Sequence, residues 1–476
     1  MRKTKIICTL GPATDRPGVL KQLAEAGMDV ARFNFSHGSY EEQGGRFKAL
    51  CQVREEVGRP IAALLDTKGP EIRLRDFENG KEQLVKGQKF TLTTREIEGT
   101  NEIVSISYKD LPHDIEVGRQ ILIDDGLIEL VVNEKTDTDI VCTVLNDGPV
   151  SNKKGVNVPG TRLTMPYLSQ KDKDDLVFGC KMGYDFVAAS FVRTADDVFE
   201  IRKVLSENGG SKIRIISKIE NKEGVDNIDE IIEASDGIMV ARGDMGVEIP
   251  GEEVPIIQKM IIKKVYHAGK QVITATQMLD SMMKNPRPTR AEISDVANAI
   301  YDGSGAIMLS GETAAGKYPV EAFKTMCRIA VRTEEVVDYK KRFQNMVTRE
   351  GFTIREAISR ATVSTAHDLN AKNIISVTLS GSTARRVSKY RPMCPVIGCA
   401  IDDQVLRQLN LTWGVVPVKV EMKEETFDLF NYAIEKTKEA GHLADGDVTV
   451  IAAGVPLGVE GTTNMIKVQK VGEELN

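Results

Sequence analysis

A lysine and a glutamate stand two residues apart at the end of the apolar segment Arg214–Glu220, which reads RIISKIE. Its isoleucines predict a buried strand. Because successive side chains of a strand point to opposite faces, Lys218 and Glu220 project to the same side. An unpaired buried charge costs on the order of several kcal/mol. The two residues are therefore either a structural salt bridge or part of a site that binds charged groups.

Polar side chains alternate with apolar ones in the segment Val30–Ser36. Arg32, Asn34 and Ser36 therefore project to one side of the predicted strand. The guanidinium of Arg32 offers a fork of donors suited to phosphate, whereas the amide and hydroxyl oxygens suit a hard cation. A polar layer inside a barrel is the alternative interpretation of these three residues.

Four oxygen-bearing residues at strand ends are candidate metal ligands. Asp66 and Thr67 end the segment Ile61–Thr67, so this strand and the preceding one can build one oxygen-lined cavity. Glu220 and Asp244 end adjacent segments, which suits two carboxylates that share a divalent ion such as Mg²⁺ and leave coordination positions for substrate and water. The alternative for Glu220 and Asp244 is a carboxylate pair held by hydrogen bonds.

Two more features complete the candidate site. Thr276 follows Ala275 at the end of another segment, and considered alone it is interpreted as a strand-end cap. Residues 242–246 (RGDMG) follow a strand and are expected to begin a short helix, whose backbone N–H groups can hold an anion. Together these residues predict a Mg²⁺ enzyme that acts on a small phosphorylated anion.

The elements that must position these residues are eight short apolar segments, each predicted to be a strand. They are Lys5–Gly11, Val30–Ser36, Ile61–Thr67, Phe186–Val192, Arg214–Glu220, Gly237–Asp244, Gln271–Gln277 and Ala306–Glu312. Apart from one gap, their spacing is roughly 25–35 residues, the length of one βα unit. Eight such units predict an α/β fold, a (β/α)8 TIM barrel, with its active site at the C-terminal strand ends. A doubly wound open sheet is the alternative, but it would not readily bring the first and last strands together.

The gap in the repeat predicts an inserted domain. Helical periodicity disappears between Pro70 and Pro166, and short strands separated by turn residues are expected instead. The predicted strands are Lys89–Thr94, Glu102–Tyr108, Gln120–Asp124, Leu127–Val132 and Ile140–Leu145. We expect residues 70–166 to form a small β-barrel lid over the barrel of residues 1–69 and 167–339. A passive insertion is the alternative, although Lys153 and Lys154 favour a lid that contacts anions.

The pattern after the eighth strand predicts a third domain, an open α/β domain of residues 340–476 with a regulatory role. Long helices are expected at Glu321–Arg342 and Ile354–Leu369. The predicted strands are Asn373–Leu379, Pro395–Ala400, Val415–Val420, Asp447–Ala452 and Met465–Val471.

Length and composition agree with this organisation. The chain has 476 residues, which predicts about three domains. Its formal net charge of −6 argues against a general binder of nucleic acid or anionic membranes. The seven cysteines include no CxxC pair and indicate free thiols in a reducing compartment. No targeting segment or long apolar run is recognisable, so a cytoplasmic protein is expected.

Eight motifs, in this order, resemble those of the pyruvate kinases across nearly the whole chain. They are Ala31–Gly38 (ARFNFSHG), Leu65–Arg73 (LDTKGPEIR), Asn152–Asn157 (NKKGVN), Ile216–Asn221 (ISKIEN), Ala241–Asp244 (ARGD), Thr274–Met278 (TATQM), Pro286–Glu292 (PRPTRAE) and Met308–Thr313 (MLSGET). The resemblance implies transfer of the phosphoryl group of phosphoenolpyruvate to ADP, giving pyruvate and ATP, as the last step of glycolysis. It also implies Mg²⁺ (or Mn²⁺) and K⁺ as cofactors, and a homotetramer.

The resemblance also implies a role for each matching residue. Lys218 stabilises charge on the phosphoryl group and the enolate, Arg32 contacts the phosphate, and Thr276 helps a proton to reach the enolate carbon. The remaining roles are Gly243 and Asp244 for the substrate carboxylate; Glu220 and Asp244 for Mg²⁺; Asn34, Ser36, Asp66 and Thr67 for K⁺; and Arg73, Lys154, Asn34 and His37 for the nucleotide. Glu71 stands where members that need K⁺ tend to carry Glu, which implies K⁺-dependent activity.

A loop in the third domain resembles the family's effector-phosphate loop. It contains Thr378, Ser380, Gly381, Ser382 and Thr383, just before a predicted helix, and hydroxyls and amides at a helix N-terminus suit a phosphate. A plain strand-to-helix turn is the alternative. Relatives often carry Lys where Ser382 stands, so the identity of the effector stays open. The chain is also expected to lack the N-terminal extension of animal members and the extra phosphohistidine-type domain of some bacterial ones.

Two other functions stay open. One is a different Mg²⁺-dependent, enolate-forming barrel enzyme, such as a carbon–carbon lyase of small keto acids, which would not need Arg73 and Lys154 for ADP. The other is a catalytically silent, metabolite-binding regulator. Four intact residues argue against it: Lys218, Glu220, Asp244 and Thr276.

Overall fold

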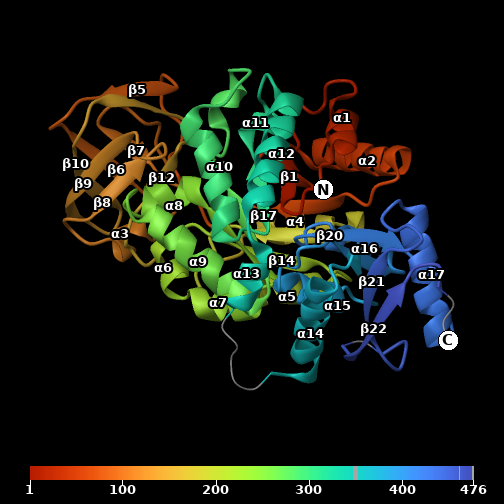
Figure 1. Cartoon of the computed structure of the whole chain (residues 1–476). Coiled ribbons are helices and arrows are strands. Elements are labelled where there is room, and N and C mark those ends of the chain that lie inside the picture. The colour runs from red at the N-terminus through yellow and green to blue at the C-terminus, as the bar shows by residue number, and fades with distance from the viewer. Residues whose placement is uncertain (347–351, 460, 474–476) are drawn as a thin grey trace.

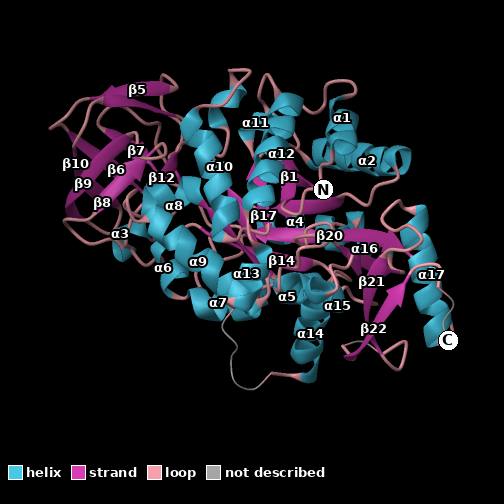
Figure 2. Ribbon diagram, in the orientation of Figure 1, coloured by secondary structure: helices cyan, strands magenta, loops and turns pink. Residues whose placement is uncertain are grey.

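The computed structural model describes residues 1–346, 352–459 and 461–473. Figure 1 shows a central barrel, a β-rich part beside it in orange, and a C-terminal part in blue on the other side. Figure 2 shows helices around the barrel strands and an almost entirely β insert. This arrangement confirms the predicted fold class.

Eight parallel strands close the barrel in the order β1-β17-β16-β15-β14-β13-β3-β2. Their bounds are Lys5–Thr9 (β1), Val30–Asn34 (β2), Ala62–Asp66 (β3), Phe186–Ala189 (β13), Arg214–Ile219 (β14), Gly237–Ala241 (β15), Gln271–Ala275 (β16) and Ala306–Leu309 (β17). Because the first strand pairs with the last, Lys5 opposite Ala306, the open-sheet alternative is wrong. Each strand ends one to three residues before its predicted last residue, because those last residues leave the ladder and enter the loops of the barrel mouth.

Helices lie around the barrel and at its mouth, and the longer ones bury apolar residues. They are α1 (Val19–Ala26), α2 (Tyr40–Val57), α4 (Gln170–Met182), α5 (Ala195–Glu207), α6 (Lys222–Asp226), α7 (Ile228–Ala234), α8 (Arg242–Glu248), α9 (Val254–Ala268), α10 (Arg290–Asp302), α11 (Gly311–Ala314) and α12 (Pro319–Val336), with a 3₁₀ turn at Asp280–Met283. Local sequence sets their starts. Ser39 and Thr289, for example, form capping boxes with the glutamates three residues later.

The insert between β3 and α4 has two sheets. One follows the order β4-β12-β8-β9-β10-β6-β7 and the other pairs β11 with β5. The bounds are Ile72–Arg73 (β4), Lys81–Leu84 (β5), Lys89–Thr93 (β6), Ile103–Ser105 (β7), Gln120–Ile123 (β8), Ile128–Lys135 (β9), Asp139–Val144 (β10), Gly148–Ser151 (β11) and Gly155–Asn157 (β12), with a short helix at Leu111–Asp114 (α3). The five predicted strands are present. The other four were missed because they are short and lack apolar runs.

The C-terminal part is an open sheet of order β20-β19-β18-β21-β22. Its strands are Asn373–Val377 (β18), Val396–Ala400 (β19), Val415–Lys419 (β20), Val448–Gly454 (β21) and Thr463–Lys470 (β22), and its helices are Tyr339–Gln344 (α13), Ile354–Asp368 (α14), Ser382–Lys389 (α15), Asp403–Leu409 (α16) and Thr426–Glu439 (α17). The single helix predicted at Glu321–Arg342 is wrong. Asp338 caps a new helix by accepting a hydrogen bond from the Lys341 amide, which separates α12 from α13.

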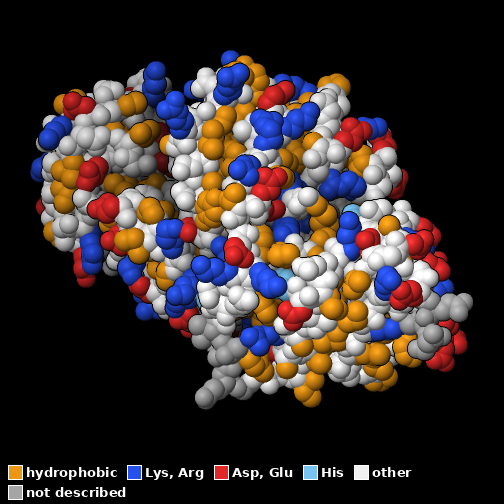
Figure 3. All heavy atoms as spheres, in the orientation of Figure 1, with side chains coloured by type: hydrophobic (Ala, Val, Ile, Leu, Met, Phe, Trp, Pro, Cys, Tyr) orange, Lys and Arg blue, Asp and Glu red, His pale blue; other side chains and the backbone are white. Residues whose placement is uncertain are grey.

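Three global properties bear on function. Acidic and basic side chains are interspersed on the face seen in Figure 3. All seven cysteines are free, in agreement with the prediction from their spacing. Among the helices described, none has the length and apolar character needed to span a membrane.

Candidate active site

Arg32, Asp66 and Lys218 converge at the C-terminal end of the barrel. Arg32 Nε lies 2.6 Å from Asp66 Oδ2, and Lys218 Nζ lies 3.1 Å from Asp66 Oδ1. Lys218 Nζ is also 3.0 Å from Glu220 Oε1, so the predicted shared orientation of Lys218 and Glu220 is correct. All four side chains are buried. The arrangement is a charged network spanning β2, β3 and β14 rather than an isolated salt bridge.

The network sets the protonation of its members. Burial lowers the pKa of the Lys218 ammonium, but the carboxylates of Asp66 and Glu220 outweigh it and raise that pKa above its ordinary value. Burial raises the pKa of Asp66, whereas Arg32 and Lys218 bring it below its ordinary value. Lys218 and Asp66 are therefore charged near neutral pH.

Glu220 differs from Asp66 because nearby positive charges do not offset the effect of burial on its pKa. Burial, together with the neighbouring Asp244, raises the pKa of Glu220 to about 8 despite the opposing effect of Lys218. Its Oε1 faces the Lys218 ammonium at 3.0 Å but makes no hydrogen bond to a described residue. A divalent cation shared with Asp244 would supply the missing positive charge, so these two carboxylates fit the predicted Mg²⁺. Across the described chain, no three His, Cys, Asp or Glu side chains gather as a metal cluster.

The four predicted K⁺ ligands lie at or just beyond the ends of two adjacent strands, β2 and β3. Asn34 and Asp66 are register partners of β2 and β3. The Asn34 Oδ1 accepts a hydrogen bond from the Ser36 amide at 3.1 Å, and Thr67 directly follows Asp66. Amide, hydroxyl, carboxylate and carbonyl oxygens are suitable ligands for a hard monovalent ion, so this donor set fits K⁺.

Thr276 directly contacts the start of α8. Its Oγ1 accepts a hydrogen bond from the Gly243 amide at 2.8 Å and donates to Ala275 O at 2.6 Å. The Thr276 backbone has a φ of 68°, which a β-branched residue rarely adopts. Arg242 donates to Thr276 O at 2.7 Å and helps to hold this conformation. The strand-end interpretation is correct in part, because Thr276 caps the helix that carries Asp244.

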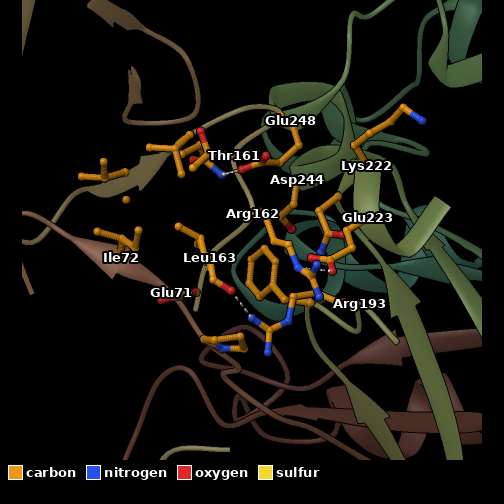
Figure 4. A pocket seen from close by; sticks show the side chains of 18 of the residues that line it. Glu71, Ile72, Thr161, Arg162, Leu163, Arg193, Lys222, Glu223, Asp244 and Glu248 are labelled. Atoms are coloured by element: carbon orange, nitrogen blue, oxygen red, sulfur yellow. Dashed lines mark hydrogen bonds and ion pairs between the residues drawn. The ribbon is translucent and has the colours of Figure 1, made fainter. Parts of the chain in front are cut away.

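A cavity of about 710 Å³ lies between the β insert and the barrel, and both Arg73 and Lys154 line it together with Asp244. Figure 4 shows Asp244 and Glu248 on its barrel side, opposite Glu71 and Ile72 of the insert. Each cation is already paired, Arg73 with Glu71 at 2.7 Å and Lys154 with Asp124 at 2.9 Å.

The two other predicted nucleotide residues, Asn34 and His37, are not brought to this cavity. Neither is among its described lining residues, and the His37 side chain is exposed. They lie at the end of β2, near the network of Arg32 and Asp66.

The predicted effector loop borders a small cavity of about 50 Å³ in the C-terminal part. Thr378, Ser380, Ser382 and Thr383 line it, and Gly381 is the left-handed N-cap of α15. The Thr383 hydroxyl is buried and hydrogen-bonded to the Thr463 hydroxyl at 2.7 Å, so it is already engaged.

Comparisons with known proteins agree with this geometry. A family model described as "Pyruvate kinase, barrel domain" matches residues 1–323, and "Pyruvate kinase, alpha/beta domain" matches residues 356–469. The chain belongs to the pyruvate kinase family.

Individual relatives extend the match to the whole chain. A pyruvate kinase of Clostridium acetobutylicum is 54% identical over 99% of this chain and 100% of its own length. One from Sporosarcina psychrophila is 51% identical over 100% of this chain and 81% of its own length. A solved pyruvate kinase structure from Cryptosporidium parvum has a TM-score of 0.94 and 41% identity, covering 98% of this chain and 96% of that one.

Four residues near the site of this pyruvate kinase family member were missed by sequence reasoning. Ser190 and Phe191 contact Lys218 and Glu220, but their segment reads as a plain apolar strand. Burial raises the pKa of Asp125 in the insert, and the nearby Asp244 carboxylate raises it further. Glu248 accepts a hydrogen bond from Asn157 at 2.8 Å across the cavity. Asp125 could have been found from the sequence, because two adjacent aspartates at a turn of the lid can bind a cation as well as form the turn.

Proposed function

We propose that this chain transfers the phosphoryl group of phosphoenolpyruvate to ADP, giving pyruvate and ATP. The observation that carries the proposal is the buried network of Arg32, Asp66, Lys218 and Glu220 at the mouth of the barrel. It concentrates cations and hydrogen-bond donors where a phosphate would sit. Phosphoryl transfer asks a protein mainly for positioning and for stabilisation of developing negative charge.

Each side chain has a role in this proposal. Arg32 holds the phosphate, and Lys218 stabilises charge on the moving phosphoryl group and on the enolate oxygen. The amides at the start of α8, from Gly243 and Asp244, bind the substrate carboxylate, and the Gly243 amide exchanges its hydrogen bond to Thr276 Oγ1 for the substrate. Thr276 guides a proton to the enolate carbon, which is consistent with its contact to the Gly243 amide.

The proposed cofactors are Mg²⁺, or Mn²⁺, held by Glu220 and Asp244, and K⁺ held by Asn34, Ser36, Asp66 and Thr67. The divalent ion supplies positive charge to the phosphoryl oxygens and the enolate oxygen. We propose that Arg73 and Lys154 release Glu71 and Asp124 in favour of the nucleotide phosphates, with Asn34 and His37 near them. Residues 70–166 would then act as a lid that excludes water.

An assay with phosphoenolpyruvate and ADP, coupled to the detection of pyruvate, tests the reaction. We expect ATP to form in proportion to pyruvate and only when ADP is present. Pyruvate formation from phosphoenolpyruvate without ADP would mean that water takes the phosphoryl group in place of ADP. Release of pyruvate from a larger keto acid, without ADP, would favour a carbon–carbon lyase. No turnover by the correctly folded chain with both cations present would favour the regulator.

We further propose a homotetramer and a phosphorylated activator as partners, in addition to the substrates and products. Sedimentation velocity of the purified chain tests the assembly. A sedimentation coefficient of a monomer at assay concentration would contradict it.

A positive charge placed near the lid hinge is expected to lower the need for K⁺. Glu71 lies beside Arg73 and, at 3.9 Å, near Lys68. In Glu71→Lys, an ammonium can replace the monovalent charge, so the ratio of activities with and without K⁺ should fall. Glu71→Gln is the matched control, because it removes the carboxylate without adding a cation. Full activity of the unmodified chain in buffer free of K⁺ and NH₄⁺ would contradict the prediction.

A negative charge in the effector loop is expected to abolish activation. Ser382 is partly exposed beside the small cavity and accepts a hydrogen bond from Arg386 at 3.2 Å, so Ser382→Glu should repel a phosphate. A differential affinity of about 1–3 kcal/mol would change the apparent substrate affinity some 5–150-fold.

The matched control is Ser382→Gln, which has a similar size and no charge. We expect sugar phosphates and nucleotides to lower the apparent KM of the unmodified chain and of the control, but not of Ser382→Glu, with saturated kcat nearly unchanged. An equal response of all three proteins would identify the loop as a simple turn.

A further inference from the structure

The turn that follows β13 contacts Lys218 of β14 and Glu220, which directly follows that strand. Ser190 is 2% exposed, and its Oγ accepts a hydrogen bond from Lys218 Nζ at 2.8 Å. The same Oγ lies 2.6 Å from Thr67 O and 3.2 Å from Asp66 Oδ1. The single proton of the Ser190 hydroxyl points toward the two acceptors, Thr67 O and Asp66 Oδ1, whereas the hydroxyl oxygen accepts from the Lys218 ammonium. Ser190 therefore links Lys218 to the backbone carbonyl of Thr67.

The next residue holds Glu220 through its backbone. The Phe191 amide donates a hydrogen bond to Glu220 Oε2 at 2.6 Å. Phe191 has a φ of 54°, a left-handed conformation that a residue with a bulky side chain rarely adopts. Such a conformation persists only where the surroundings enforce it. Here it coincides with an amide that points at the catalytic carboxylate.

Both ends of the β insert touch this turn. At the C-terminal end, the buried Tyr167 hydroxyl donates to Ser190 O at 3.0 Å. At the N-terminal end, a Cβ on Gly69 would lie 2.9 Å from Ser190 Cβ and 3.0 Å from Ser190 O. Only glycine allows this approach, and Gly69 also has a φ of 73°. Residues 69 and 167 flank the proposed lid of residues 70–166.

We propose that the Ser190–Phe191 turn positions Lys218 and Glu220, and that Tyr167 ties this turn to the lid. Ser190 and Tyr167 are positioning residues, because they act through Lys218 and Glu220. When the base of the lid shifts, the Tyr167 hydroxyl moves the backbone carbonyl of Ser190. The side-chain hydroxyl of Ser190 holds the Lys218 ammonium, so the shift reaches Lys218. The kinetic test of this inference rests on the proposed phosphoryl transfer, whereas the structural test is independent of it.

The first experiment compares Ser190→Ala with Ser217→Ala. Ser217 is the matched control: it is buried, precedes Lys218 on β14, and hydrogen-bonds the Ser235 hydroxyl at 2.6 Å. A misplacement of about 1 Å can cost about 100-fold in rate. We expect Ser190→Ala to lower kcat by roughly 10–100-fold at nearly unchanged KM for phosphoenolpyruvate, and Ser217→Ala to lower only the melting temperature. Equal kcat values in the two variants would overturn the role of Ser190.

The second experiment removes one hydroxyl by Tyr167→Phe and keeps the ring. Tyr184→Phe is its control, because the buried Tyr184 hydroxyl has no hydrogen-bond partner among the described residues. We expect kcat to fall several-fold in Tyr167→Phe and to stay unchanged in the control, at similar melting temperatures. This variant also keeps the inference testable if Ser190→Ala does not fold. Equal rates in both tyrosine variants would show that Tyr167 does not act on the turn.

Crystal structures of the variants test the inference without turnover. We expect Lys218 Nζ to move by more than about 0.5 Å in Ser190→Ala, the tolerance of a preorganised site, and to stay in place in Ser217→Ala. An unmoved Lys218 in Ser190→Ala would overturn the inference even for an active enzyme. If the unmodified chain shows no ADP-dependent turnover but Lys218 still moves in Ser190→Ala, the proposed function fails and the positioning role stands.

Discussion

Replacement of Lys218 by Met is expected to lower kcat by roughly 10²–10⁴. The ammonium lies about equally far from Asp66 and Glu220, at 3.1 and 3.0 Å, and it stays protonated because both carboxylates raise its pKa above the ordinary value. Its charge acts most strongly when negative charge develops on the phosphoryl group and the enolate. Substrate binding should weaken much less, because Arg32 and the metal ion still hold the phosphate. Steady-state kinetics at saturating phosphoenolpyruvate and ADP measure the effect.

Lys5→Met is the matched control for Lys218→Met. Lys5 is also a buried barrel lysine near a carboxylate, 3.7 Å from Asp29, but it lies at the start of β1 and therefore at the opposite end of the barrel. We expect Lys5→Met to lower the free energy of unfolding and to leave kcat nearly unchanged. A near wild-type kcat in Lys218→Met would remove Lys218 from the mechanism.

Loss of either proposed Mg²⁺ ligand is expected to raise the Mg²⁺ concentration needed for half-maximal activity steeply and to lower kcat. Glu220→Gln and Asp244→Asn each remove one negative charge, and two carboxylates are the only charged ligands proposed for the ion. The buried Glu220 Oε1 lies 3.0 Å from the Lys218 ammonium but makes no hydrogen bond within the described residues, so it can still coordinate a metal ion. Activity measured over a Mg²⁺ titration, with the Mn²⁺ affinity of the substrate-free protein as a second readout, gives the result.

Asp185→Asn is the control for the loss of a buried carboxylate. Asp185 precedes β13 at the opposite rim and pairs with Arg54 at 3.5 Å and Arg407 at 2.9 Å. Its replacement should destabilise the fold without moving the Mg²⁺ midpoint. Unchanged titrations in both Glu220→Gln and Asp244→Asn would instead support a structural carboxylate pair.

The sequence alone was sufficient to predict the barrel and the shared orientation of its central charged pair. Eight apolar segments at βα spacing predicted a closed barrel, and the pairing of β1 with β17 confirms it. Polar residues at the segment ends predicted where the site lies, because parallel strands present their C-terminal ends at one face. Period-two alternation was enough to place Lys218 and Glu220 on the same side, and they lie 3.0 Å apart.

Only the tertiary structure decided which groups contact one another across strands. The bond between Ser190 and Lys218 joins residues 28 positions apart, and the contact between Tyr167 and Ser190 crosses the lid base. Periodicity reports which face of a segment is buried, but not the register between strands or the backbone angle of a loop. The left-handed Phe191, which aims its amide at Glu220, therefore has no local sequence signal, because its conformation is enforced by the packing of Gly69 and by the hydrogen bond to Glu220.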